Sequence, residues 1–178
     1  EGEYFLFCDA DNILLPDYAA TVVDVFSRST EAAAVVPRFQ IFDDSLGEDQ
    51  TIVQGLPFDR ALNVFRNSVG DAGAAFRREV FWEHGLRYDV DVDTYSDWAL
   101  WMDIASQGLP IETVPRVLYR YRQREGSMMS EYAWDRHLPM VGMLIQKHLP
   151  DTTEREREVL ITLLQGWGVG AILSALSG

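Results

Sequence analysis

The sequence predicts an α/β protein in which a mixed sheet is flanked by helices and followed by a C-terminal helical tail. Two observations indicate this class. Short apolar runs of strand length alternate with amphipathic runs of helix length over about the first two thirds of the chain, and only the helical pattern continues beyond them. With 178 residues, of which 47% are hydrophobic, the chain can form one packed core and is not a disordered polypeptide.

Five short apolar segments are predicted strands. They are residues 4–8, 32–42, 74–76, 111–114 and 117–121. The first is continuously apolar, which is typical of a strand buried on both faces in a parallel or mixed sheet covered by helices. Pro115 separates the last two, and the acidic residues 43–50 predict a solvent loop.

The remaining regular segments are predicted helices, at residues 17–29, 59–69, 78–84 and 97–107. Pro16 suits the start of the first, while Gly85 and Gly108 end the third and fourth. From about residue 130 the chain is helical, with a break at Leu149-Pro150-Asp151. These patterns divide the chain into an α/β part, residues 1–128, and a helical extension, residues 129–178.

The acidity of the chain limits its classes of partner. Lys and Arg number 15 against 28 Asp and Glu, which gives a formal net charge of −13. A sequence-independent contact with nucleic acid needs a basic surface, so no nucleic-acid partner is expected, and an electrostatic anchor on anionic lipid is disfavoured. Cys8 is the single cysteine and cannot form an intrachain disulfide. We expect a cytoplasmic protein, either free or peripheral at the inner face of the membrane.

Both ends of the chain carry an expectation. Glu1 and Glu3 stand where a signal peptide would be positive, and an apolar strand begins almost at once, so we expect the chain to be cut from a longer protein. Residues 159–178 contain no charged side chain over a length that could span a bilayer. Because the segment includes four glycines and several hydroxyl side chains, buried or interfacial helices broken near Gly166 are favoured over a membrane span.

The first candidate site follows the first predicted strand. Asp9 and Asp11 are two residues apart, and Asn12 adds a neutral oxygen donor. Carboxylates so spaced beyond a strand end can converge on one hard cation, and ligands of open α/β sheets bind at the carboxyl ends of strands. The alternative is a turn whose acidic residues cap the helix after Pro16, and the motif leaves both interpretations open.

The second candidate is Asp97, at the start of a predicted helix. The helix dipole would stabilise its charge, Thr94 could cap the helix, and we expect the carboxylate to be ionised at neutral pH. Such a group can accept a proton from a hydroxyl nucleophile. An ordinary surface helix explains the pattern equally well.

The third candidate is a run of arginines on a predicted strand. Alternation sends Arg120, Arg122 and Arg124 to one face, and Tyr119 and Tyr121 to the other. Guanidinium groups bind diphosphates in bidentate fashion, so the run is a candidate diphosphate site. The alternative is an edge strand guarded by charge.

Two metal patterns are rejected. Four aspartates in residues 89–97 imitate the start of a calcium loop, but Thr94 stands where glycine is needed and Leu100 where the closing acid is needed. The three histidines are far apart, with no His or Cys at ligand spacing, so no zinc site is expected.

Taken in order, these segments resemble the family-2 glycosyltransferases of the GT-A fold. The matching residues are Tyr4 to Asn12 with Pro16, Ala72 to Phe81 with Gly85, Ser96 to Trp101, Gly108 to Ile111, and Tyr121 to Ser127. The resemblance covers about residues 1–130, and its order and spacing are more specific than any one motif. It implies that residues 1–128 are the C-terminal portion of a GT-A-like catalytic domain.

The resemblance also implies a reaction. The donor would be a UDP-, GDP- or dTDP-sugar, the acceptor a saccharide or a lipid-linked hydroxyl, and the mechanism inverting. Mg²⁺ or Mn²⁺ would bind Asp11, with Asp9 at the ribose or at the edge of the metal, and Asp97 would be the catalytic base. The remaining implied contacts are Arg122 and Arg124 on the donor side and Gly73, Ser96 and Trp98 on the acceptor side.

The chain departs from the family pattern at three points. Ser96 replaces the usual Glu, Arg124 stands where many members have His, and the family's N-terminal half with its nucleotide-binding strands is absent. We therefore expect the 178 residues alone to be inactive and to self-associate through the exposed first strand. Two other functions stay open: a non-catalytic interaction fragment, and a haloacid-dehalogenase-type phosphatase, whose motif needs Thr where this chain has Ile13.

Overall fold

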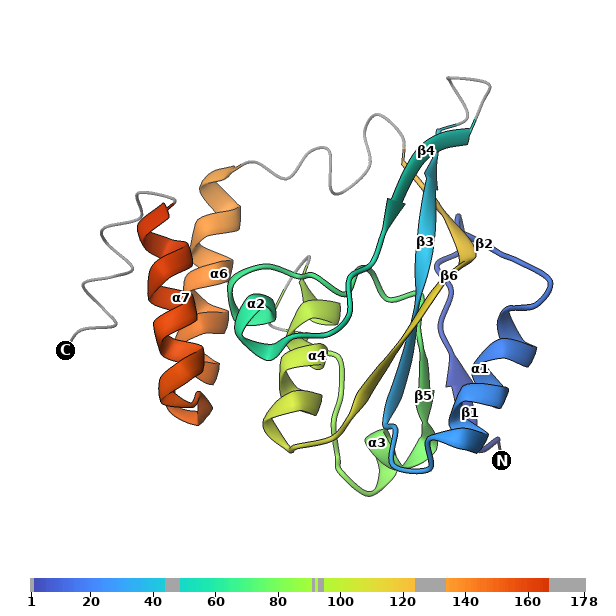
Figure 1. Ribbon diagram of the computed structural model, residues 1–178, viewed down its shortest axis with the longest axis horizontal. Coiled ribbons are helices and arrows are strands. Elements are labelled where there is room, and N and C mark those ends of the chain that lie inside the picture. Colours follow the sequence, from blue (N-terminus) through green and yellow to red (C-terminus); the bar gives the residue numbers. More distant parts are fainter. Residues whose placement is uncertain (1, 44–48, 91, 93–94, 124–133, 167–178) are drawn as a thin grey trace.

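The structure is a computed structural model that describes residues 2–43, 49–90, 92, 95–123 and 134–166. Its strands are β1 (Tyr4–Leu6), β2 (Ile13–Leu14), β3 (Ala34–Phe42), β4 (Asp49–Gln54), β5 (Ala75–Arg77) and β6 (Ile111–Arg122). Its helices are α1 (Tyr18–Arg28), α2 (Arg60–Phe65), α3 (Arg78–Trp82), α4 (Ser96–Ser106), α6 (Trp134–His148), the 3-10 turn η2 (Leu149–Asp151) and α7 (Glu154–Gly166). The predicted α/β class with a helical tail is confirmed (Figure 1).

The sheet is mixed. Its strands lie in the order β1-β5-β3-β6-β2, with β4 beside the far end of β3. β3 and β6 are parallel, whereas the pairs β1–β5, β3–β5, β2–β6 and β3–β4 are antiparallel. As a result, the end of β1, the start of β5 and the end of β6 all lie at one edge of the sheet.

The expectation of a first strand buried on both faces is wrong. β1 pairs with β5 alone among the described strands, and Leu6 is 36% exposed. Its side chains are only partly covered: Tyr4 stacks on Phe26 of α1 on one face at 4.6 Å, and on the other face Phe7 contacts Phe76 and Tyr88 at ring-centroid distances of 5.5 Å. A continuous apolar run therefore marks an edge strand here.

The expectation of two separate strands around Pro115 is also wrong. β6 is one strand from Ile111 to Arg122, and its partner β3 is paired with both halves. The register shifts opposite Pro37, so that Val114 and Val117 are paired with consecutive residues of β3 and Pro115 lies in the bulge between them. Proline is tolerated in a strand at such an irregularity because no ladder hydrogen bond is lost there.

Helices cover both faces of the sheet. On one face, Tyr18, Val22 and Phe26 of α1 are buried against β3 and β6. On the other, α3 and α4 pack against β5, and the ring of Trp101 stacks on Phe76 at 5.1 Å. The residues of α4 that face the sheet are Leu100, Trp101 and Ile104.

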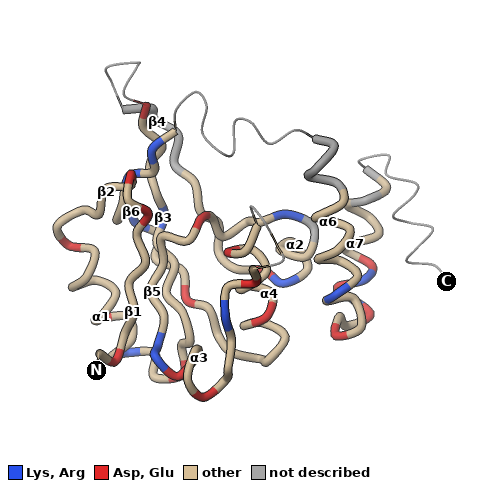
Figure 2. The backbone as a smooth tube through the Cα atoms, turned by 180° about the vertical axis from the view of Figure 1, so that it is seen from behind, with Lys and Arg blue, Asp and Glu red and all other residues tan. Residues whose placement is uncertain are grey.

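The opposite side of α4 is buried as well, because the helical tail covers it. Trp98 and Met102 pack with Val141 and Leu144 of α6 and with Leu160 of α7. The view from behind in Figure 2 shows the same order of layers, with the sheet at one end and α6 and α7 at the other. The predicted break at residues 149–151 is confirmed, and no described helix has the length and apolar character needed to cross a bilayer.

Candidate active site

Four segments far apart in the chain meet at the edge of the sheet where β1 and β6 end. They are the loop after β1, the turn before β5, the first turn of α4 and the last residues of β6. The antiparallel pairing of β1 with β5 brings the first two together, and the N–H of Phe7 donates to the carbonyl of Ala74 at 3.0 Å. Asp9, Asp71 and Asp97 from these segments are close enough that the charge of one raises the pKa of another.

Asp71 lies at the centre of the hydrogen bonds in this region. Its Oδ1 accepts the N–H of Gly73 at 2.9 Å and the hydroxyl of Tyr119, while its Oδ2 accepts Nδ2 of Asn12 at 3.0 Å. The Oδ1 of Asn12 in turn accepts the backbone N–H of Arg122 at 3.0 Å. Sequence reasoning missed Asp71, although an Asp two residues before a Gly is a signal for such a side-chain-to-backbone turn.

Gly73 occupies a position that has no room for a side chain. A Cβ there would lie 2.7 Å from the ring of Tyr119 and 2.9 Å from Oδ1 of Asp71. The close approach of the turn to β6 therefore depends on glycine. The predicted acceptor-side role of Gly73 stays a prediction, but its position beside Asp71 places it within the candidate site.

Asp97 lies in the first turn of α4 and is partly buried. Its Oδ1 accepts the N–H of Trp98 at 2.7 Å, and its Oδ2 accepts Nδ2 of Asn67 at 3.4 Å. Burial raises the pKa of Asp97 to about 7, the negative charge of Asp71 adds to the rise, and the Trp98 N–H opposes it. The expectation that the helix start keeps Asp97 ionised at neutral pH is wrong, because desolvation outweighs the helix N-terminus.

The pKa values of the neighbouring carboxyl and thiol groups are shifted in the same direction. Asp9 is an exposed residue, but partial burial of its carboxyl raises its pKa, and the charge of Asp11 adds to the effect. Burial also raises the pKa of Asp71, although hydrogen bonds from Tyr119 and Gly73 oppose it. The pKa of the Cys8 thiol is likewise raised, chiefly by burial and by Asp9. A region in which every shift favours the neutral form is one that an added cation would stabilise.

The arginines on β6 lie as the alternation predicts. The guanidinium groups of Arg120 and Arg122 lie over the ring of Phe42, at 4.5 and 4.7 Å from its centroid. Tyr119 and Tyr121 lie on the other face against Phe39, with ring-centroid distances of 5.2 and 5.6 Å. The Nε of Arg122 donates to the carbonyl of Asp11 at 3.0 Å, which links this strand to the loop after β1. Arg124 lies outside the described residues.

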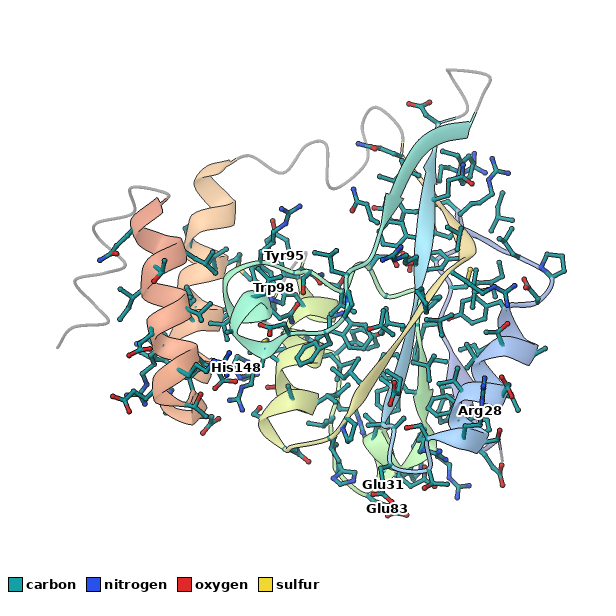
Figure 3. All side chains as sticks on the ribbon, in the orientation of Figure 1. Arg28, Glu31, Glu83, Tyr95, Trp98 and His148 are labelled. Carbon is teal, nitrogen blue, oxygen red and sulfur yellow. The ribbon has the colours of Figure 1, made fainter. Side chains whose placement is uncertain are left out.

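The two other acceptor-side residues differ in their surroundings. Ser96 is the partly exposed first residue of α4. Trp98 is only 1% exposed, and its indole N–H donates to the carbonyl of Asn63. Figure 3 shows Trp98 and Tyr95 between α2 and α4, and their rings meet edge to face at 5.5 Å. The Trp98 side chain is thus part of the core, and its contribution to the site is the backbone N–H that it donates to Asp97.

Tyr88 is a second residue that sequence reasoning missed. Its hydroxyl is buried without a hydrogen-bond partner among the described residues. Burial and the charges of Asp97 and Asp9 raise the pKa of this phenol, so the group remains a neutral donor beside the carboxylates. Its sequence context, a loop after Gly85, contains no signal for this position.

The carboxylates are suited to a cation only in part. No three His, Cys, Asp or Glu side chains of the described residues are arranged to bind a metal together. Asp9 and Asp11 still offer two hard oxygen ligands on one loop, and Mg²⁺ is commonly bound by one or two carboxylates with substrate phosphates and water. The residues present therefore fit a divalent cation whose remaining ligands come from a substrate.

The fold is shared with solved structures of other proteins at low sequence identity. Three structures of TarS from S. aureus are among them. TarS residues 1–349 in complex with UDP-GlcNAc align with a TM-score of 0.58 at 16% identity, over 92% of this chain and 48% of that one. The complex with UDP gives 0.54 at 13% identity, and TarS 1–349 without a named ligand gives 0.52 at 12%, each over 92% of this chain and 46% of that one.

At these identities the likeness to TarS establishes the fold alone. The chain spans about half the length of the TarS structures that it matches. No protein-family model matches the sequence, and no curated protein matches it either. The resemblance to family 2 fits the fold and stays a prediction.

Proposed function

We propose that the protein is a glycosyltransferase that moves a sugar from a nucleotide-sugar donor to an acceptor hydroxyl. One observation carries the proposal: a fold shared with TarS, which binds UDP-GlcNAc, brings Asp9, Asp11, Asp97 and Arg122 to one edge of the sheet. A non-catalytic fragment would not need four charged side chains gathered in one place, one of which, Asp97, is partly buried with its pKa raised to about 7.

The donor side of the proposed site is the loop after β1 together with the end of β6. Asp11, with Asp9 beside it, would bind Mg²⁺ or Mn²⁺, and the ion would neutralise charge on the departing diphosphate. Arg122 lies against this loop and Arg124 follows it in sequence, so both are proposed to contact the diphosphate. UDP-sugars are the first donors to test, with GDP- and dTDP-sugars next.

The acceptor side of the proposed site is Asp97. In the proposed step, the oxygen of the acceptor hydroxyl forms a bond with the anomeric carbon while the bond from that carbon to the diphosphate oxygen breaks. The hydroxyl proton passes to the Asp97 carboxylate, and the nucleoside diphosphate leaves with the bonding electrons. Attack opposite the leaving group inverts the anomeric carbon. A base with a pKa of about 7 is well matched to this task.

Calorimetry on the full-length protein tests the proposal. UDP-GlcNAc, UDP, GDP and dTDP are titrated with and without Mn²⁺, and the expected result is metal-dependent binding of one of the three nucleotide classes. Asp11→Ala should abolish this binding, and Asp24→Ala is its matched control, because Asp24 is an exposed carboxylate on α1 that pairs with Arg28, away from the site. Binding of none of the three nucleotide classes would favour the non-catalytic interpretation and refute the proposal.

A further inference from the structure

The side chain of Asn12 links the loop that carries Asp9 and Asp11 to two other segments of the site. Asn12, directly after it, donates Nδ2 to Oδ2 of Asp71 at 3.0 Å and accepts the N–H of Arg122 on Oδ1 at 3.0 Å. These partners are 59 and 110 residues away in the chain. The amide of Asn12 therefore connects three separate segments: the loop, the turn before β5 and the end of β6.

The direction of each hydrogen bond is determined by its neighbours. A backbone N–H can only donate, so the oxygen of Asn12 must face Arg122 and the NH₂ must face Asp71. Oδ1 of Asp71 already accepts from Gly73 and Tyr119, which leaves Oδ2 for Asn12. An amide at one position and a carboxylate at the other satisfy every group, whereas two amides or two carboxylates do not.

We propose that Asn12 and Asp71 are positioning residues that keep the Asp9–Asp11 loop against Arg122 so that carboxylates and guanidinium meet the donor diphosphate together. This inference rests on the proposed function and adds two residues to it. Neither is proposed to touch the reacting atoms. They act through the loop, because Arg122 donates both to Asn12 through its backbone and to the Asp11 carbonyl through Nε at 3.0 Å. Hydrogen-bonded supports of this kind are commonly worth 10- to 100-fold in affinity.

An exchange of the two residues tests the hydrogen bond between Asn12 and Asp71, which we call the bridge. Asp71→Asn sets an NH₂ against the NH₂ of Asn12, and Asn12→Asp sets two carboxylates against each other. Each single variant should weaken the affinity of the full-length protein for UDP with Mn²⁺ by roughly 10- to 100-fold. The double variant restores the donor and acceptor pattern with the two groups exchanged, and its affinity should return to within about threefold of wild type. If each residue contributed independently of the other, the double variant would not regain affinity.

Two controls separate the bridge from folding and from charge. Asn12→Ala removes the bridge without creating repulsion, so it should weaken UDP binding with little change in the melting temperature. Asp59→Asn makes the same chemical change at the exposed N-cap of α2, where Asn caps as well as Asp, and should leave the affinity unchanged. Hydrogen exchange at the Arg122 amide should be faster in both single variants and slow again in the double variant.

The outcomes distinguish this inference from the proposed function. A wild-type protein that binds none of UDP, GDP and dTDP refutes the proposed function and this inference with it. Wild-type binding combined with unchanged affinity in Asn12→Ala and Asp71→Asn overturns the inference alone. A double variant as weak as the single ones, with the Arg122 amide still exposed to exchange, also overturns it.

Discussion

The ionisation of Asp97 makes the sharpest prediction about pH. With a pKa of about 7, the carboxylate is ionised in about 10% of molecules at pH 6 and about 90% at pH 8. If the ionised form is the base, kcat/KM at pH 6 should be about a tenth of its plateau. A carboxylate with the ordinary pKa near 4 would leave the rate unchanged over this range.

The assay is the pH–rate profile of sugar transfer by the full-length protein between pH 5 and 9, with saturating Mn²⁺. Asp97→Asn should lower turnover by roughly 10²–10⁴-fold and flatten the profile, while donor affinity stays near that of wild type. An NMR titration that follows the carboxyl carbon of Asp97 should give the same midpoint as the pH–rate profile. A flat wild-type profile, or a carboxyl midpoint near pH 4, would refute the reasoning about burial.

The same shift affects stability with a definite sign. The unfolded chain releases the Asp97 proton near pH 4, whereas the folded chain keeps it to about pH 7. Between these values the folded state binds more protons, so this residue's contribution to the free energy of unfolding decreases as pH rises. In Asp97→Asn the decrease should be smaller, which denaturant titrations at several pH values can measure.

Three further predictions concern other parts of the chain. Asp11→Ala should abolish metal-dependent binding of UDP in calorimetry while circular dichroism stays unchanged, and unchanged affinity would remove Asp11 from the site. The 178-residue chain should self-associate through the exposed side of β1 and show no transfer of sugar. In light scattering, Leu6→Lys should lower the apparent mass of the chain. A wild-type chain that is monomeric and active would contradict this prediction. Tyr88→Phe should raise the free energy of unfolding by about 1 kcal/mol, because it removes a buried hydroxyl without a partner among the described residues; a lower melting temperature would contradict the reason given.

Local patterns predicted most of the elements but not how they pair. The helices at α1, α3 and α4, the long strand β3 and the break before α7 follow from turn residues and apolar spacing that act within a few residues. Pro115 was misleading because its effect depends on the partner strand β3, which tolerates a bulge there. The edge position of β1 likewise depends on which strands are its neighbours.

Sequence reasoning selected the candidate residues whose signal lies within one segment. It missed those whose contacts form only when the strands pair. Asp9, Asp11 and Arg122 carry the signal of a strand end or of alternation. Asp71 gains its importance from Asn12 and Tyr119, which reach it only after β1, β5 and β6 are paired. The Asp97 pKa was mispredicted for a similar reason: the sequence shows the start of a helix, but not that this carboxyl is buried once the chain has folded.

The pairing of distant strands has a consequence for the biosynthesis of the protein. Arg122 follows Asp9 by 113 residues, so a ribosome adding about 5–20 residues per second completes the site roughly 6 to 23 s after its first carboxylate. During most of that interval β1 has been synthesised without β5, and the rings of Phe5 and Phe7 lack their later partners Phe81 and Phe76. Nascent chains in this state are open to capture by chaperones and to aggregation. Substitutions that delay the β1–β5 pairing therefore reduce the yield of folded protein, even where the activity of each folded molecule is untouched.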